Sequence, residues 1–402
     1  MARLPDGDPA PRDGALPAAA LAGLGTRPFG LYVHVPFCAS RCGYCDFNTY
    51  IPGEGAVREG YAGAVLAELD LARRVLGDRA PAVDTVFFGG GTPTLLAPDE
   101  LAAILRGIEE RFGLAPGAEV TTEANPESVD ARALAALREA GLTRVSLGMQ
   151  SASERVLATL DRRHTPGRAV AAAREARAAG FAHVSLDLIY GTPGETDDEW
   201  RASLEAALEG APDHVSAYAL IVEPGTRLAA RVRRGELPAP DDDVLAARYE
   251  LADDLLSAAG LRWYEISNWA RGDDARSRHN VGYWAGGDWW GAGPGAHSHV
   301  GGVRWWNALH PARWSAALAD GASPAAGREE PGPEAAGLER VMLGLRLAEG
   351  LALDAVDAAA AEQAVQDGLL DPGALTRGRA VLTRRGRLLA DRVTLDLLRQ
   401  PA

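Results

Sequence analysis

Short apolar runs alternate with longer amphipathic runs between residues 30 and 260 of this 402-residue chain. The apolar runs have the length of strands that are buried on both faces, and the runs after them carry apolar side chains at helical spacing. Strands that alternate with helices are typical of a parallel sheet joined by crossover helices. Six such units predict an α/β fold, a partial (β/α)6 barrel whose reactive groups lie at the carboxyl ends of the strands.

The same pattern sets the bounds of the predicted elements within a core that spans residues 28–262. The predicted strands are Leu31–Val35, Val83–Phe88, Ala118–Thr122, Arg144–Leu147, Ala182–Ile189 and His214–Leu220. The predicted helices are Val57–Leu76, Asp99–Phe112, Val129–Ala140, Ser153–Leu160, Gly167–Ala179, Asp197–Leu208 and Asp241–Ala259.

The pattern changes after this core. Residues 263–318 hold eight of the nine tryptophans and four of the eight histidines, and their short alternating runs predict a small Trp/His-rich subdomain of sheet and loops. Residues 319–332 are rich in Gly, Pro and Ala and predict a linker. Residues 333–402 contain helical runs and two short strand-like runs, which resemble a winged-helix module at the level of fold. For residues 1–27 we expect a mobile extension.

Composition and charge narrow the class of protein. The hydrophobic content of 47% is ample for a large core in two or three domains. The net charge is −14, and every permanent positive charge is an arginine because the sequence has no lysine. An acidic chain without a basic run is poorly suited to non-specific nucleic-acid binding, so we expect no nucleic-acid partner. No run reaches the ~18 apolar residues of a membrane helix, and residues 1–27 lack the pattern of a signal peptide, so we expect a cytoplasmic protein without a membrane segment.

All three cysteines of the chain, Cys38, Cys42 and Cys45, lie in one short run with C-x3-C-x2-C spacing. Three thiolates can serve one metal centre and leave its fourth position without a cysteine ligand. A four-iron cluster normally takes four thiolates, so three would leave one iron open.

Other uses of these cysteines compete with a cluster. A disulfide framework is excluded because three is an odd number and no further cysteine exists. A zinc site that adds His34 as its fourth ligand stays open on spacing alone. Buried structural thiols would not need such clustering, and unpaired thiols crowded in one loop fit a reducing cytosol.

Further candidate residues lie at or after the carboxyl ends of the predicted strands. Gly89–Thr92 follows the second strand, and consecutive glycines let a backbone approach a ligand, although an ordinary strand-to-helix turn looks the same. Glu123, Gln150 and Asp187 lie on or at the ends of the next three strands, and Arg162 lies between the last two of these. Each is by itself more often a solvated or capping group. Together, behind a three-cysteine loop, they predict one ligand site.

The cysteine run and its flank, Tyr32-x-His-x-Pro-Phe-Cys38, resemble the signature of the radical SAM superfamily. Further segments are similar to the coproporphyrinogen dehydrogenase-like family within it, over nearly the whole chain. These segments are Gly89–Thr94, Gln150-Ser151, Leu160-x-Arg-x-His164, Asp187–Gly194, Val341–Gly350 and Leu382–Asp391.

This resemblance implies cofactors and their contacts. A [4Fe–4S] cluster would be held by Cys38, Cys42 and Cys45. S-adenosylmethionine would bind the open iron, where an electron from the cluster releases a 5′-deoxyadenosyl radical. The family's contacts to S-adenosylmethionine correspond here to Tyr32, Gly90, Gly91, Thr92, Glu123, Gln150, Arg162 and Asp187.

Two branches of the family differ beside the last cysteine. The oxygen-independent coproporphyrinogen dehydrogenases, the HemN branch, carry a further cysteine where this chain has Phe47. The Cys-Asp-Phe run resembles the HemW branch, the haem chaperones, as do His279-Asn-Val-Gly-Tyr-Trp284 and Gly291-Ala-Gly-Pro-Gly-Ala-His-Ser298. The resemblance therefore implies a chaperone that binds haem and transfers it to an apo-haemoprotein, with an electron donor for the cluster.

Haem itself needs an axial nitrogen, sulfur or oxygen ligand and a flat apolar bed. Because the cysteines are committed to the cluster, histidine, methionine or tyrosine remains. His279 lies in an aromatic-rich segment, although such a segment is more often plain core. The resemblance makes His279 the predicted haem ligand. The rival ligands are His297, His299 and His310.

Two further functions stay open at this point. One is oxidative decarboxylation of coproporphyrinogen III, in which the adenosyl radical would abstract a hydrogen from a propionate side chain. Phe47 in place of cysteine speaks against that reaction, so we predict that the activity is absent. The other is a radical enzyme acting on an unrelated substrate. The oligomeric state is also open.

Overall fold

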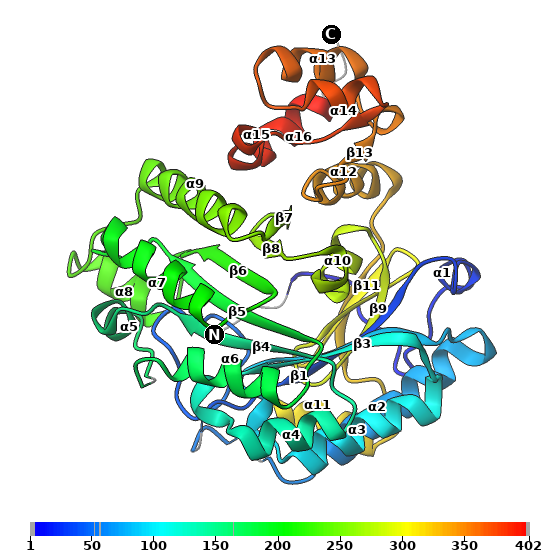
Figure 1. Cartoon of the computed structure of the whole chain (residues 1–402). Coiled ribbons are helices and arrows are strands. Elements are labelled where there is room, and N and C mark those ends of the chain that lie inside the picture. Colours follow the sequence, from blue (N-terminus) through cyan, green and yellow to red (C-terminus); the bar gives the residue numbers. More distant parts are fainter. Residues whose placement is uncertain (1–4, 52, 56–57, 164, 399–402) are drawn as a thin grey trace.

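The computed structural model describes residues 5–51, 53–55, 58–163 and 165–398. Within this part, six parallel strands follow one another in chain order at the centre of a curved sheet (Figure 1). These strands are β1 (Phe29–Val35), β2 (Val83–Gly90), β3 (Leu114–Ala124), β4 (Arg144–Gln150), β5 (His183–Tyr190) and β6 (His214–Ala219). The predicted α/β class and the partial barrel are therefore confirmed.

Helices follow the strands and cover one face of the sheet (Figure 1). They are α2 (Tyr61–Leu76), α3 (Pro98–Phe112), α4 (Ala131–Glu139), α5 (Glu154–Thr159), α6 (Arg168–Ala178), α7 (Asp197–Glu209), α8 (Arg227–Arg233) and α9 (Asp242–Ala258). Along β1, Leu31, Val33 and Val35 are fully buried in the main core, to which all of these helices except α5 and α8 contribute. The intervening side chains therefore face the other side of the sheet. The predicted start of the first long helix, Val57, lies outside the described residues.

Further strands extend both edges of the same sheet. Next to β1, β9 (Asp288–Ala292) pairs in parallel, and β10 (His297–Val300), β11 (Val303–Asn307) and β12 (Ala325–Glu329) continue antiparallel. Next to β6 lie β8 (Asn268–Ala270) and then β7 (Arg262–Glu265). Among the described residues the outermost strands, β12 and β7, do not pair with each other, so the barrel is open.

This arrangement differs from the separate subdomain predicted at residues 263–318 and from the linker predicted at residues 319–332. The first segment contributes strands to both edges of the main sheet, and the second contains β12. The physical reason is that the edges of a parallel sheet present unpaired N–H and C=O groups, which further strands of the chain satisfy.

The N-terminal segment runs beside this added edge. It contains α1 (Ala18–Ala22), and Asp8 pairs with Arg328 of β12 through backbone hydrogen bonds of 2.8 and 2.9 Å. The amide of Ser323 donates to the carbonyl of Arg12 at 2.7 Å. The described part of the predicted mobile extension, residues 5–27, therefore has fixed contacts in this structure.

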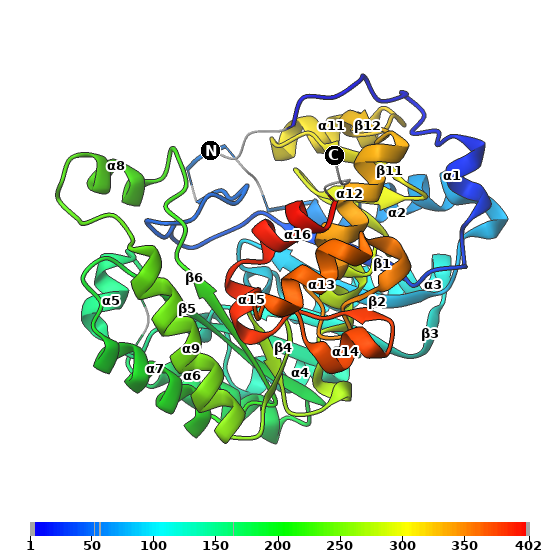
Figure 2. The ribbon, with the colours of Figure 1, turned by 90° about the horizontal axis from the view of Figure 1, so that it is seen from above.

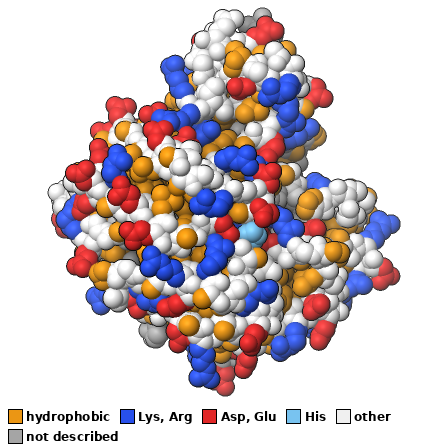
Figure 3. All heavy atoms as spheres, in the orientation of Figure 1, with side chains coloured by type: hydrophobic (Ala, Val, Ile, Leu, Met, Phe, Trp, Pro, Cys, Tyr) orange, Lys and Arg blue, Asp and Glu red, His pale blue; other side chains and the backbone are white. Residues whose placement is uncertain are grey.

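The C-terminal unit has a core of its own and projects beyond α9 and α10 (Arg278–Trp284) (Figures 1 and 2). Its helices are α12 (Pro333–Gly344), α13 (Ala358–Gln366), α14 (Pro372–Thr376), α15 (Arg384–Leu388) and α16 (Ala390–Leu398), and its strands are β13 (Leu351–Ala352) and β14 (Arg379–Ala380). Arg387 holds the unit to the sheet by stacking 3.8 Å above the ring of Trp263. On the face drawn in Figure 3, acidic and arginine side chains are interspersed.

Candidate functional site

The three cysteines lie in a loop that follows β1 and is fixed at both ends. The amide of Cys38 donates to the carbonyl of Tyr50 at 3.0 Å, and the amide of Tyr50 donates to Pro36 at 2.7 Å. In the middle of the loop the amide of Cys45 donates to the carbonyl of Cys42. The loop therefore folds back on itself at the carboxyl end of the sheet, where ligand sites of α/β proteins lie.

The thiols are partly buried and lie close enough to influence one another. Burial raises the pKa of Cys38 and raises that of Cys45 to about 11, and the neighbouring thiols add to both effects. A guanidinium nitrogen of Arg162 lies 3.6 Å from the sulfur of Cys42. A metal centre favours the thiolate form, so binding iron would reverse these pKa shifts and release protons.

The zinc alternative needs His34 as its fourth ligand, and the structure commits that ring elsewhere. Its Nδ1 hydrogen-bonds the Tyr32 hydroxyl at 2.9 Å, and its Nε2 hydrogen-bonds the carbonyl of Asn48 at 2.9 Å. Across the described ranges, no three His, Cys, Asp or Glu side chains gather tightly enough to hold a single metal ion. Three thiols without a histidine fit a multi-iron cluster better than a mononuclear zinc site, which takes four protein ligands.

The glycine run at the end of β2 touches the cysteine loop. A Cβ on Gly91 would lie 2.5 Å from the carbonyl oxygen of Phe37 and 3.0 Å from the sulfur of Cys38. Gly90 has a φ of +111°, which side chains rarely adopt. The hydroxyl of Thr92 lies 3.9 Å from the sulfur of Cys38. Glycine is therefore required here so that the end of the strand can approach the thiols.

Two carboxylates lie beside this run, Glu123 on β3 and Asp187 on β5, with β4 between the two strands. The amide of Gly90 donates to Glu123 at 3.1 Å, and the hydroxyl of Ser146 donates to Asp187 at 2.7 Å. Burial raises the pKa of Glu123 to about 8, and the nearby Asp187 adds to the shift. Burial also raises the pKa of Asp187, against the hydrogen bonds from serine hydroxyls. A cationic or hydroxyl-bearing ligand that enters between them would stabilise the charged carboxylates.

Arg162 reaches back toward the cysteines from the segment that follows α5. One guanidinium nitrogen contacts Cys42, and another donates to the carbonyl of Gly148 at 3.0 Å. Its Nε is buried and has no hydrogen-bond partner in the described part of the chain. Gln150, at the end of β4, has a φ of +62° and turns the chain at this point. An unsatisfied donor on a planar guanidinium fits a carboxylate ligand.

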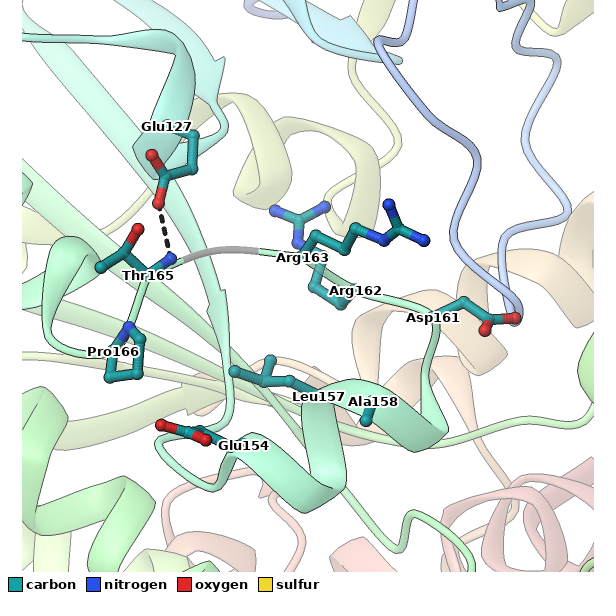
Figure 4. Close-up of a pocket in the computed structure, with 9 residues that line it drawn as sticks. All are labelled: Glu127, Glu154, Leu157, Ala158, Asp161, Arg162, Arg163, Thr165 and Pro166. Carbon is teal, nitrogen blue, oxygen red and sulfur yellow. Dashed lines mark hydrogen bonds between the residues drawn. The ribbon is translucent and has the colours of Figure 1, made fainter.

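A cleft of about 760 Å³ opens beside this arginine (Figure 4). Arg162 and Arg163 lie along one side, and Glu127 lies across from them and accepts a hydrogen bond from the amide of Thr165 at 2.6 Å. Positively charged guanidinium groups and negatively charged carboxylates therefore both line the cleft. A ligand with an ammonium and a carboxylate group, such as an amino acid, needs partners of both signs.

Tyr32 lies on β1 and faces the concave side of the sheet. Its ring stacks on Phe87 at 6.2 Å between centroids and on His279 at 6.4 Å. Burial raises the pKa of its hydroxyl well above the usual value, and the charge of Glu123 adds to this. Among the predicted contacts, Tyr32 therefore lies near Glu123 and the glycine run of β2, on the concave face of the sheet.

His279 is placed differently. It is buried on α10, where Nδ1 hydrogen-bonds the Thr85 hydroxyl and Nε2 hydrogen-bonds the Tyr283 hydroxyl, both at 2.8 Å. Its ring stacks on Phe87 at 5.1 Å, and burial lowers its pKa to about 3. An iron atom at Nε2 would have to displace the hydroxyl of Tyr283.

Two supporting residues were missed by sequence reasoning. Ser146 donates a hydrogen bond to Asp187. The alternation of buried and less buried residues along β4 could have identified it, because this pattern places Ser146 and Gly148 on the same face of the strand. Glu119 receives hydrogen bonds from the amide of His279 at 3.1 Å and from Arg144 at 3.1 Å, and thereby fixes the start of α10. Nothing local marks Glu119, because its partners are far away in the sequence.

The family model described as the Radical SAM superfamily matches residues 32–207. The chain is 57% identical over 383 residues to "Heme chaperone HemW" of Mycobacterium tuberculosis (strain ATCC 25618 / H37Rv), covering 94% of this chain and 97% of that protein. It is 32% identical over 376 residues to the protein of the same name from Bacillus subtilis (strain 168), covering 90% and 97%.

Among solved structures, coproporphyrinogen III oxidase (HemN) from Escherichia coli, a radical SAM enzyme, matches with a TM-score of 0.80. The sequence identity is 22%, and the match covers 96% of this chain and 94% of that one. At this identity the likeness concerns the fold alone. No helix in the described ranges is long and apolar enough to cross a membrane.

Proposed function

The chain belongs to the HemW family of radical SAM proteins, and from this premise we propose that it is a haem chaperone that transfers haem to an apo-haemoprotein. The observation that carries the proposal is the near full-length similarity to proteins of that name. The unpaired thiols fit a reducing compartment, so we place the activity in the cytoplasm.

In this proposal Cys38, Cys42 and Cys45 hold a [4Fe–4S] cluster. When bound, the cluster supplies an iron without a protein ligand and an electron, which a separate donor protein must provide. The contacts of Gly91 and Thr92 with Cys38 keep this side of the loop close to the end of β2. Arg162 places a positive charge beside Cys42 and so favours its thiolate.

S-adenosylmethionine binds, in this proposal, across the strand ends. Arg162 takes the carboxylate through its guanidinium, whose Nε has no other described partner. Glu123 and Asp187 take the ammonium group and the ribose hydroxyls, and Gly90 lets the ligand approach the backbone. Gln150, Thr92 and Tyr32 complete the proposed set.

Oxidation of coproporphyrinogen is the second candidate function, because the fold matches an enzyme of that activity. Phe47, just after the last cysteine, favours the chaperone function over the oxidase function. Phe47 is 61% exposed, and it stands where the oxidase motif has a further cysteine. A large apolar side chain left in solvent beside the cluster loop supplies no sulfur ligand and offers a contact to a partner protein.

The two functions are separated by parallel assays on one preparation. The protein is reconstituted anaerobically with iron and sulfide, and haem binding is titrated by absorbance. The same preparation is incubated with coproporphyrinogen III, a reductant and S-adenosylmethionine, with a coproporphyrinogen oxidase as positive control. Stoichiometric haem binding without decarboxylated product supports the chaperone. Product formation at a rate near that of the control would replace it by the oxidase.

A further inference from the structure

A second cavity, of about 280 Å³, lies on the concave side of the sheet between β1, α10 and the β9–β10 turn. It is lined by Tyr32, His34, Tyr283, Trp289, Gly295 and His297. Tyr32 also belongs to the proposed S-adenosylmethionine site. His34 also hydrogen-bonds the carbonyl of Asn48, in the segment that follows the three cysteines.

The walls of this cavity are flat and aromatic. The ring of Tyr283 packs edge-on against Trp289, with 4.6 Å between centroids. Tyr32 stacks on Phe87 behind it. A cavity walled by such aromatic rings suits a planar conjugated ligand, because aromatic side chains pack well against the face or edge of a flat ring system.

The four candidate histidines differ in what their ring nitrogens do. Both nitrogens of His279 are hydrogen-bonded within the protein. Nδ1 of His310 accepts from the amide of Ala312 at 3.2 Å, so a neutral ring carries its proton on Nε2 and offers no lone pair there. Nδ1 of His299 donates to the carbonyl of Gly287 at 2.9 Å, which leaves a lone pair on Nε2, but the side chain is only 16% exposed and does not line the cavity.

His297 is the exception. Its side chain is exposed at the cavity, and neither ring nitrogen has a hydrogen-bond partner among the residues that the structure describes. The ring leans on Trp306, with 5.9 Å between centroids. Partial desolvation by the surrounding protein lowers the pKa of the imidazole, against the charge of Glu329, and a neutral imidazole is the form that ligates iron.

The backbone around His297 is held in place. Gly295 has a φ of +76°, and a Cβ there would lie 2.7 Å from the side-chain nitrogen of Asn48. Asn48 donates to the carbonyl of Pro294 at 2.9 Å. The turn that carries His297 is thus tied directly to the cysteine loop.

We infer that His297 is the axial ligand of the transferred haem and that the aromatic cavity beside it receives one edge of the macrocycle. The inference rests on the proposed function and names its haem site. The cavity is smaller than the roughly 300–1,000 Å³ of pockets that enclose a ligand, so most of the macrocycle stays outside. A half-exposed haem on a surface histidine is available to an acceptor protein.

The test is a haem titration of the full-length reconstituted protein and of variants at two histidines of one strand face. His297→Ala should weaken haem binding about tenfold or more and shift the Soret band, and added imidazole should restore the wild-type spectrum. His297→Tyr should bind haem with the spectrum of a phenolate ligand. His299→Ala, two residues away on β10, is the matched control and should leave the Soret band unchanged.

Iron content and circular dichroism of each variant verify that the fold and cluster are intact. Wild-type protein that binds no haem would overturn the proposed function itself. Wild-type protein that binds haem, with an unchanged Soret band and affinity in both His297 variants, would overturn only the inference. Loss of the Soret band in His279→Ala or His299→Ala, with His297→Ala unaffected, would assign the ligand to that residue instead.

Discussion

Replacing Arg162 by alanine tests the proposed S-adenosylmethionine site most sharply. The guanidinium lies 3.6 Å from the sulfur of Cys42 and 3.0 Å from the carbonyl oxygen of Gly148, and its Nε has no described partner. A charge-assisted hydrogen bond to a carboxylate contributes about 1.5–3 kcal/mol. At about 1.4 kcal/mol for each tenfold change, Arg162→Ala should weaken binding roughly 10- to 150-fold.

The assay is a titration of the reduced, reconstituted protein with S-adenosylmethionine, followed by the EPR signal of the cluster. Arg106→Ala is the matched control, because Arg106 is exposed on α3 and does not line the cleft. Arg162→Lys should give an intermediate affinity, since lysine keeps the charge but loses the planar fork. Equal dissociation constants for Arg162→Ala and Arg106→Ala would refute the assignment.

Three further predictions concern the cluster, pH and stability. Cys42→Ala should abolish the visible iron–sulfur absorbance after reconstitution, and stoichiometric zinc without iron uptake in the wild type would contradict the cluster. Burial raises the pKa of Glu123 from 4.5 to about 8, so the protonated carboxyl stabilises the ligand-free fold at low pH, and this contribution is lost as the pH rises toward 8. Glu123→Gln should flatten the plot of melting temperature against pH in this range. An unchanged slope in the variant would contradict the raised pKa. Glu119→Ala removes the carboxylate partner of Arg144, whose side chain is only 2% exposed. Urea unfolding should then show a free energy of unfolding lower by about 3–5 kcal/mol. Asp70→Ala, which removes the exposed partner of Arg111, is the control and should change it by less than about 1 kcal/mol.

The centre of the fold could be predicted from local pattern because each buried strand is a short apolar run and each helix has its own periodicity. Leu31–Val35 and Val83–Phe88 lie inside observed strands for this reason. The same logic placed Glu123 and Asp187 at one edge of the sheet, since parallel strands end together. The short helix α8 was missed, because it comprises one hydrophobic turn among arginines.

The sheet edges and the histidine environments could not be predicted, because their partners are distant in sequence. β9 pairs with β1 across more than 200 residues, and no local signal in Asp288–Ala292 marks that pairing. The motif around His279 suggested a metal ligand. Its hydrogen bond to Thr85, which lies 194 residues earlier, becomes visible only in three dimensions.

Transfer of haem from this protein to another protein can be followed directly in a mixing experiment. The haem-loaded protein is mixed with increasing amounts of an apo-haemoprotein, and the Soret band of the acceptor is followed by stopped-flow absorbance. Spontaneous release is measured in parallel with an excess of a haem scavenger. The transfer rate should rise with acceptor concentration and exceed the rate of spontaneous release. A rate equal to spontaneous release at every acceptor concentration would contradict the proposed chaperone function.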